Sequence, residues 1–325
     1  MGDLLFTGSK DRKIKFWNIK TGETLGSMDA HSDGVFSLES FTNLKNGTNL
    51  ISGGGNYESL VCLWDVNNLG NKPVVFQGHR SGVTAICAMQ DKRTFVTGSY
   101  DNAIIVWDSL NPSSKVSLTS HKAMVSTLLP LSPTLFLSGS WDKRILLWEL
   151  KTGEDGKDER SYQQDKNEKS IAQKLEEYSP MKCLLLKEFT ENFAILSLAR
   201  SLMSPHRVYV GGVGKRLGVL DMEVGGWENE EYSCSHFGVN ELMVLEVSYS
   251  KHFIFGMSTN DSSIRVWENG NSEPIGSKKD KNYPILENIN SGPKMGHFHD
   301  ERGDNELIVV VGGDGKCVDI FEMKE

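Results

Sequence analysis

Seven stretches of this 325-residue chain repeat one pattern. Each has an apolar run, a glycine-rich step near an acidic residue, and an alternating segment that ends on a bulky side chain. The stretches span 4–18, 50–65, 94–108, 135–149, 208–221, 253–268 and 307–322, and five of them end on tryptophan plus a polar or acidic residue. A unit that recurs roughly every 40 to 50 residues cannot bury its own apolar face, so it must pack on its neighbours.

The pattern within each unit predicts paired β-strands, because apolar and polar residues alternate between glycine-rich steps. We expect the Gly-Ser or Gly-Gly pair of each unit to form the turn. His31, His79 and His121 each open a further alternating run before the next unit. These features resemble the WD-repeat family, whose units carry a Gly-His, a turn aspartate and a closing Trp-Asp pair. The resemblance implies an all-β, seven-bladed β-propeller of four-stranded antiparallel blades.

The resemblance covers residues 1–325 as one domain, apart from two longer segments. A charged insert at about 151–180 extends the hairpin between the third and fourth strands of a blade, and a long loop at about 278–291 precedes the last unit. In the insert, Ile171, Leu175 and Tyr178 have the spacing of a short amphipathic helix for docking a partner; a solvated loop is the alternative.

The first and last blades are each expected to lack one strand. The chain begins at the second strand of the first unit and ends at the third strand of the seventh. An unpaired inner edge leaves backbone groups without hydrogen bonds. We therefore expect either a segment outside this sequence that completes the ring or a ring with two three-stranded blades.

The resemblance also implies a buried hydrogen-bond network in each blade, formed by the loop histidine, the turn aspartate, a strand hydroxyl and the tryptophan. One blade would join His79, Asp101, Trp107 and either Thr97 or Ser99, and the next would join His121, Asp142, Trp148 and either Ser138 or Ser140. A Ser-His-Asp set also fits a hydrolase triad, but its recurrence in successive blades favours a structural role.

Two blades depart from this pattern. In the second, Gly53–Gly55 and Asn56–Ser59 replace and lengthen the usual turn, so we expect its turn aspartate to be lost. The fifth lacks the tryptophan, the aspartate and the histidine, and we expect it to be the least stable blade.

The composition is that of a globular protein with no bias toward nucleic acid or anionic membranes, since the net charge is −8 and 24% of residues are charged. No apolar run is long enough for a spanning helix. The five cysteines are odd in number and unclustered, which favours reduced thiols and a cytoplasmic or nuclear location.

The strongest sequence signal for function lies in the loops expected on the narrow top face of the propeller. Family members commonly hold partners through the residue before the turn aspartate and the residue after the first valine of the inner strand. Clustered aromatic residues with a flexible methionine are typical of binding hot spots. The predicted partner-binding residues are Lys10, Phe36, Tyr100, Met124, Trp141, Asn240 and Asn260. The alternative is that Trp141 packs only on a neighbouring loop.

The remaining motifs are weaker. Basic residues after the turn acids could meet phosphates or an acidic peptide, or could be solvated strand starts; they are Arg12, Lys13, Lys15, Lys143, Arg144, Lys215 and Arg216. His297 and His299 lack a third metal ligand, and 210–216 lacks the spacing of a phosphate loop, so we expect no metal and no cofactor.

These observations favour a non-catalytic scaffold that binds peptides or loops of other proteins. We expect a monomeric ring that can belong to a larger complex. Three alternatives remain: a substrate-recognition subunit of a ubiquitin ligase, a permanent structural subunit of a complex, and an enzyme with a propeller fold. The enzyme would need converging carboxylates or histidines in the channel, where the candidate residues are mostly apolar or amide.

Overall fold

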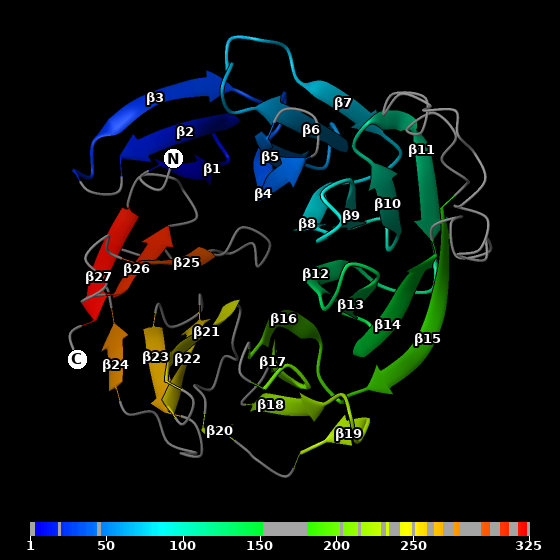
Figure 1. Ribbon diagram of the computed structural model, residues 1–325, viewed down its shortest axis with the longest axis vertical. Coiled ribbons are helices and arrows are strands. Elements are labelled where there is room, and N and C mark those ends of the chain that lie inside the picture. The colour runs from blue at the N-terminus through cyan, green and yellow to red at the C-terminus, as the bar shows by residue number, and fades with distance from the viewer. Residues whose placement is uncertain are drawn as a thin grey trace, which may run out of the picture.

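The computed structural model describes residues 4–18, 21–43, 47–151, 181–201, 204–213, 216–228, 232–233, 241–248, 251–258, 263–268, 276–279, 294–299, 306–311 and 318–323. Within these ranges all regular elements are β-strands, and no helix occurs. The strands form seven antiparallel sheets, here called sheets 1 to 7 in chain order (Figure 1).

The first four sheets contain fifteen strands. Sheet 1 has β1 (Leu4–Gly8), β2 (Lys13–Asn18) and β3 (Thr24–Asp29). Sheet 2 has β4 (Val35–Asn43), β5 (Gly47–Gly54), β6 (Leu60–Asp65) and β7 (Val74–Gln77). Sheet 3 has β8 (Val83–Ala88), β9 (Thr94–Ser99), β10 (Ile104–Asp108) and β11 (Asn111–Leu118). Sheet 4 has β12 (Val125–Pro130), β13 (Leu135–Ser140), β14 (Arg144–Lys151) and β15 (Lys182–Thr190).

The last three sheets follow the same order. Sheet 5 has β16 (Ile195–Arg200), β17 (Arg207–Gly212), β18 (Arg216–Asp221), β19 (Gly226–Trp227) and β20 (Tyr232–Ser233). Sheet 6 has β21 (Glu241–Ser248), β22 (Lys251–Ser258), β23 (Ser263–Glu268) and β24 (Gly276–Lys279). Sheet 7 has β25 (Lys294–His299), β26 (Glu306–Val311) and β27 (Val318–Met323).

The strand order confirms the repeat derived from the sequence. Sheets 1 and 7 have three strands, as predicted, and four of the others have four. In sheet 5 both β19 and β20 pair with β18, so its outer strand is split. Figure 1 shows the sheets following one another around a common centre, with β8, β12 and β16 near the middle and β11 and β15 at the rim.

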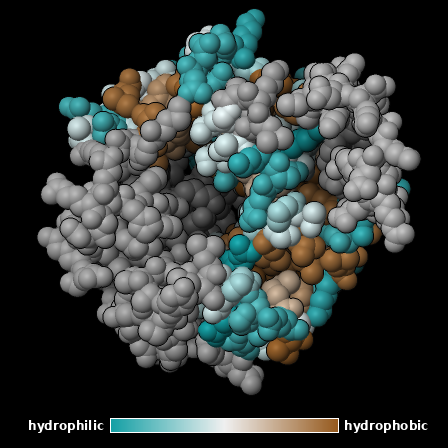
Figure 2. All heavy atoms as spheres, viewed as in Figure 1, coloured by the Kyte–Doolittle hydropathy of each residue, from teal (hydrophilic) through white to brown (hydrophobic). Residues whose placement is uncertain are grey.

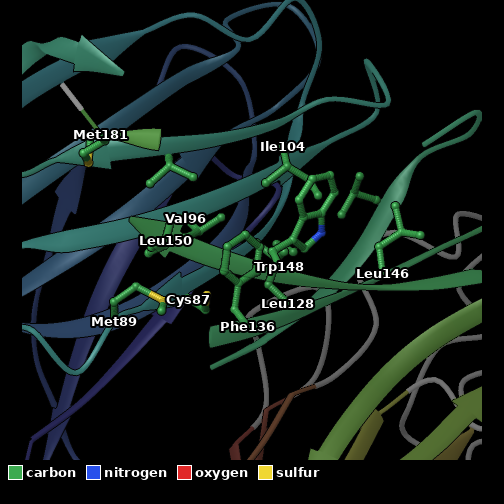
Figure 3. Packing of buried hydrophobic residues seen from close by; sticks show 13 residues of the cluster. Cys87, Met89, Val96, Ile104, Leu128, Phe136, Leu146, Trp148, Leu150 and Met181 are labelled. Atoms are coloured by element: carbon green, nitrogen blue, oxygen red, sulfur yellow. The ribbon is translucent and has the colours of Figure 1, made fainter. Parts of the chain in front are cut away.

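The apolar cores lie between neighbouring sheets. One cluster joins Val96 and Ile104 of sheet 3 to Phe136 and Trp148 of sheet 4, and all four are nearly inaccessible to solvent (Figure 3). The rings of Phe136 and Trp148 stack with centroids 6.2 Å apart. Similar clusters join sheets 1 and 2, 2 and 3, 4 and 5, and 5 and 6. Each unit therefore buries its apolar face on the next, as its length requires.

In the units where the structure describes them, glycines of these steps lie in strands, so the prediction that the Gly-Ser and Gly-Gly pairs form the turns is wrong there. Gly98 and Gly139 belong to β9 and β13. A Cβ atom on Gly98 would lie 2.5 Å from Val125 Cγ1, and one on Gly139 would lie 2.6 Å from Ile195 Cγ2. Glycine is needed there because the inner strand of the next sheet packs directly on the backbone.

Candidate functional site

A buried network in sheet 3 joins the loop before β8 to the turn after β9. His79 Nδ1 lies 3.1 Å from Asp101 Oδ2, and His79 Nε2 lies 2.7 Å from Thr97 Oγ1. The indole N–H of Trp107 donates to the same Thr97 oxygen at 2.8 Å. Because a carboxylate only accepts, Nδ1 carries the imidazole proton and Nε2 accepts from the threonine hydroxyl.

Sheet 4 repeats this network with serine in place of threonine. His121 Nδ1 lies 3.0 Å from Asp142 Oδ2, and His121 Nε2 lies 2.7 Å from Ser138 Oγ. Trp148 Nε1–H donates to Ser138 Oγ at 2.9 Å. The hydroxyl in each network is therefore the one in the middle of the strand.

Ser99 and Ser140, the alternative hydroxyls, have a different role from the network residues. The Ser99 hydroxyl accepts from the backbone N–H of Asp101 at 3.1 Å and donates to Ser81 O at 3.1 Å. Ser140 accepts from the N–H of Asp142 at 3.0 Å and donates to Ala123 O at 3.1 Å. They fix the turn from outside the network.

These sets do not have the environment of a hydrolase triad. Ser138 and Thr97 are 0% exposed, and both nitrogens of each imidazole already have a partner. Burial alone raises the pKa of Asp101, but hydrogen bonds from His79 and from two backbone N–H groups outweigh it and lower the pKa to about 2. The carboxylate stays ionised as a structural acceptor.

Sheet 2 holds the same network with a glutamate as its acid. The turn aspartate is lost, as predicted, but Glu58 takes its role, which the sequence analysis missed. His31 Nδ1 lies 3.1 Å from Glu58 Oε2, and His31 Nε2 lies 2.8 Å from Ser52 Oγ. Trp64 Nε1–H donates to Ser52 Oγ at 2.8 Å. The extra methylene of glutamate compensates for the longer turn. An acidic residue anywhere in the lengthened turn was the signal that could have revealed it.

The networks also fix the loops at this end of the sheets, which we call the histidine face: the loops carrying His31, His79 and His121 and the turns carrying Glu58, Asp101 and Asp142. The residue after each histidine donates its backbone N–H to the acid. The distances are 2.8 Å from Ser32 to Glu58, 2.7 Å from Arg80 to Asp101 and 2.8 Å from Lys122 to Asp142. The backbone of the residue before each acid is therefore held next to this hydrogen bond.

Two of the predicted partner-binding aromatics meet on this face. The rings of Phe36 and Tyr100 pack edge to face, with centroids 6.4 Å apart at 71°. Phe36 also lies against the backbone of Gly34 and Gly82. Pairing shifts register between Val35 and Ser37, so Phe36 is the extra residue of a β-bulge, a feature that redirects a side chain.

Trp141 and Met124 lie at the corresponding place in sheet 4. The backbone N–H of Trp141 donates to Met124 O at 3.0 Å. The indole N–H of Trp141 and the hydroxyl of Tyr100 are both buried, and neither has a hydrogen-bond partner in the part of the chain that the structure describes. Burial raises the pKa of Tyr100 to about 12. An unsatisfied buried donor is costly, and a partner can reach neither atom unless its side chain moves.

Identifying Glu58 as the acid reveals a partner-face residue that sequence reasoning missed. Tyr57 precedes Glu58 just as Tyr100 precedes Asp101 and Trp141 precedes Asp142. Its side chain is 96% exposed, the highest of the large apolar residues described. Three successive sheets thus present an aromatic residue at the same turn position.

The other predicted residues divide into three groups. Lys10 is exposed in the turn between β1 and β2. Thr84 and Ser126, which follow the first valine of the inner strand as Phe36 does, lie at equivalent bulges and donate to the backbone of the next sheet at Val125 O and Ile195 O. The third group lies outside the described residues and consists of Asn240 and Asn260. The same is true of residues 152–180 of the insert and 280–291 of the long loop.

The described part of the chain holds no group of three or more His, Cys, Asp or Glu placed to bind a metal ion. Within the same part, no helix has the length and apolar character to cross a membrane.

Comparison with known proteins agrees with the repeat pattern. The family model "WD domain, G-beta repeat" matches residues 1–18, 70–108 and 112–149. The chain is 35% identical over 114 residues to "Target of rapamycin complex subunit LST8" of Saccharomyces cerevisiae, covering 35% of this chain and 36% of that protein. It is 23% identical over 166 residues to "Ribosome biogenesis protein WDR12 homolog" of Drosophila virilis, covering 46% of this chain and 39% of that protein.

The matches thus span less than half the length of either relative. The matched residues of the family model include the complete His79 network and the complete His121 network. Together with the repeated sheets, these similarities identify the chain as a WD40-repeat protein, distantly related to the two relatives.

Proposed function

We propose that the seven sheets close into a single β-propeller domain over residues 1–325, and that this ring is a non-catalytic scaffold. In this proposal a peptide or loop of another protein binds across the histidine face. The support for closure is the unbroken series of contacts between the innermost strands of successive sheets, from β1 and β4 to β21 and β25.

The observation that carries the function is the row of aromatic residues on loops that the networks hold rigid. Tyr100 and Trp141 follow a strand end fixed by a serine hydroxyl and precede an acid bonded to histidine. Binding to a preformed surface avoids the entropy cost of ordering it. Large aromatic side chains near the centre of a contact contribute most of the binding free energy.

A catalytic role has less support. The histidine-acid pairs are buried and fully used, and the relative named as a complex subunit suggests assembly as the role of this chain too. Cys62 and Cys87 are buried free thiols and Cys183 is a half-buried one. Free thiols are consistent with a cytoplasmic or nuclear location, which is part of this proposal.

The test is a double variant, Tyr100→Ala with Trp141→Ala, compared with the wild type by affinity purification and mass spectrometry. We expect the variant to lose the wild-type partners while its melting temperature stays close to that of the wild type. The control is Leu184→Ser with Leu186→Ser, which removes exposed apolar groups from β15 instead. Unchanged partners in the aromatic variant would refute the proposed site.

A second candidate, a permanent structural subunit of a complex, is favoured by one observation. Leu184, Leu185 and Leu186 of the outer strand β15 are 46%, 44% and 50% exposed. Figure 2 shows hydrophobic side chains gathered over this part of the rim. Exposed apolar patches of this kind mark protein contacts. If this candidate is correct, the leucine variant loses partners and the aromatic variant keeps them.

A further inference from the structure

Exposed cations lie on three loops of the histidine face and on the turn between β1 and β2, which adjoins the His31 loop at Gly34. Lys10 lies in that turn, Arg80 and Lys122 follow the histidines before sheets 3 and 4, and Lys143 follows Asp142. None of the four makes an ion pair within 4.0 Å among the described residues. This cationic row contrasts with the net charge of −8 of the whole chain.

The carboxylates of the same loops keep their charge, but each accepts hydrogen bonds from groups of its own or a neighbouring loop, and none pairs with the four cations. Asp101 and Asp142 point inward to histidine. Asp33 accepts from the backbone N–H of Gly34 at 2.7 Å and of Tyr57 at 3.1 Å. At the margins, Asp11 accepts from the N–H of Lys13, and Glu191 accepts from the N–H of Asn192.

Cations and aromatics alternate along this face because one acid places both. Asp101 holds the backbone of Arg80 and directly follows Tyr100, and Asp142 holds the backbone of Lys122 and directly follows Trp141. Tyr57, before Glu58, extends the row into sheet 2. The result is a surface on which charged and flat apolar groups recur from sheet to sheet.

Backbone strain at Lys143 supports a requirement for charge. Its φ is 71°, in the left-handed region, where sheet 3 has Asn102 at 67°. Asparagine is among the residues that tolerate this conformation best, whereas lysine gains nothing from it. Strain that is retained in this way tends to occur at functional positions.

Building on the proposed function, we propose that the histidine face of sheets 1 to 4 binds an acidic segment of a partner protein, rich in aspartate or glutamate and carrying at least one large apolar residue. The apolar residue packs among Tyr57, Tyr100 and Trp141, and the carboxylates meet Lys10, Arg80, Lys122 and Lys143. Potentials of opposite sign across an interface favour encounter and fix register.

Single carboxylates fit this arrangement better than phosphate groups. Lys10, Lys122 and Lys143 lie on three different loops and each supplies a single ammonium group, whereas a phosphate dianion is best held by several converging donors or by a guanidinium fork. Arg80 supplies a guanidinium, and such a fork also pairs with a carboxylate. Arg144 has such a fork on this face, but its guanidinium is already bonded to Asp142, Glu188 and the carbonyl of Ser120.

The test begins with a displayed library of random peptides of about ten residues, selected on the purified full chain. We expect enrichment of sequences with several acidic residues and an aromatic or aliphatic residue. The best peptide is then synthesised with a fluorophore, and its Kd is measured by anisotropy. The affinity should fall as sodium chloride rises from low to physiological concentration.

Two variants with equal charge change separate the face from the rest of the surface. Lys122→Glu with Lys143→Glu should weaken the acidic peptide at least about tenfold, since like charges then oppose it. The control is Lys72→Glu with Lys182→Glu, which should leave Kd nearly unchanged. Lys72 is exposed between β6 and β7 of sheet 2, and Lys182 is exposed at the start of β15 in sheet 4. Tyr57→Ala should weaken binding about threefold or more, and Tyr57→Phe should weaken it less. All variants are checked by melting temperature.

The outcomes distinguish this inference from the proposed function. Enrichment of neutral or basic peptides that still need Tyr100 and Trp141 would overturn the acidic partner and leave the scaffold intact. Binding only by phosphoserine versions of the peptides would overturn the choice of carboxylates. If every selected peptide binds the wild type and the Tyr100→Ala, Trp141→Ala variant equally well, both proposals fail.

Discussion

Sheets 3 and 4 differ from sheet 5 in how each sheet is held together. In sheets 3 and 4 a tryptophan on the third strand is bonded through a hydroxyl to a histidine and an acid. In sheet 5 the tryptophan position is taken by Leu220, which is 0% exposed. Trp227 lies instead on the outer strand, half-buried, with its ring against Gly218.

Apolar burial alone is thus sufficient to form a sheet. Val208, Val210 and Leu220 of sheet 5 are each 0% exposed, like the core of sheets 3 and 4. What sheet 5 lacks, in its described residues, is a histidine-acid bond that ties the loop before the first strand to the turn after the second. We infer that the networks add rigidity to the loops of the histidine face, whereas the sheets themselves depend on contacts with their neighbours.

The largest expected effect separates the two tryptophans. Trp107→Ala should lower the free energy of unfolding by about 3–5 kcal/mol, because it opens a cavity and removes the donor to Thr97. Trp107 is 0% exposed, whereas Trp227 is half-buried, so Trp227→Ala should cost less than half as much. Urea unfolding followed by circular dichroism measures both. Equal losses would mean that the network sheets have no special dependence on their tryptophan.

The next effect concerns pH. Asp101→Asn should cost about 1.5–3 kcal/mol at neutral pH, because His79 and the N–H groups of Arg80 and Ala103 then lose a charged acceptor. The folded pKa of Asp101, about 2, lies below its ordinary value of 3.8. Its contribution is therefore complete above about pH 4 and is lost as pH falls toward 2.

Wild type and the Asp101→Asn variant should accordingly converge in stability over that acid range. Asp221→Asn in sheet 5 is the control, because its carboxylate is bonded to exposed backbone N–H groups of Glu223 and Val224 and to no histidine. Melting temperatures of the three proteins between neutral and acid pH give the comparison. A difference in melting temperature between wild type and Asp101→Asn that stays constant with pH would show that Asp101 stabilises the fold through its packing and not through its charge.

The repeat and the strand order could be predicted from the sequence because the strand pattern recurs in all seven units. The residues of two networks could be predicted because the third and fourth units repeat them at nearly the same spacing. The alternation gives strands, and the repeat length requires sheet-on-sheet packing. The choice between Thr97 and Ser99, or between Ser138 and Ser140, could not be made. It depends on which hydroxyl faces the tryptophan across the hairpin, and both residue types fit the spacing.

Other features depended on distances that a sequence does not contain. Glu58 was missed because an inserted turn changes the spacing, and Tyr57 was missed with it. The role of Gly98 and Gly139 was misassigned, since glycine signals a turn as readily as a close approach by a neighbouring strand. The split outer strand of sheet 5 and the position of Trp227 had no signal in the repeat.

A smaller effect tests the contact between sheet 4 and sheet 5. Gly139→Ala should destabilise the protein by about 1–3 kcal/mol, because the new methyl group would overlap Ile195 and Thr127. Gly226→Ala, in the outer strand of sheet 5, meets no atom within 4 Å and should be nearly neutral. Thermal melting of the two single variants is the measurement. Equal stability would show that sheet 5 shifts away from sheet 4 without cost, as expected for a loosely held sheet.

The smallest effect compares sheets 3 and 4 with each other. Lys143→Asn copies Asn102 of sheet 3 into the same left-handed position and should stabilise the protein by less than about 1 kcal/mol. The same change removes a cation from the histidine face, so the affinity for an acidic peptide should fall while the melting temperature rises. Opposite signs in melting and anisotropy measurements on one variant would show that sheet 4 retains strain for binding. A gain in stability with no loss of affinity would instead show that Lys143 does not contribute to binding. The proposed contacts to carboxylates would then depend on Lys10, Arg80 and Lys122.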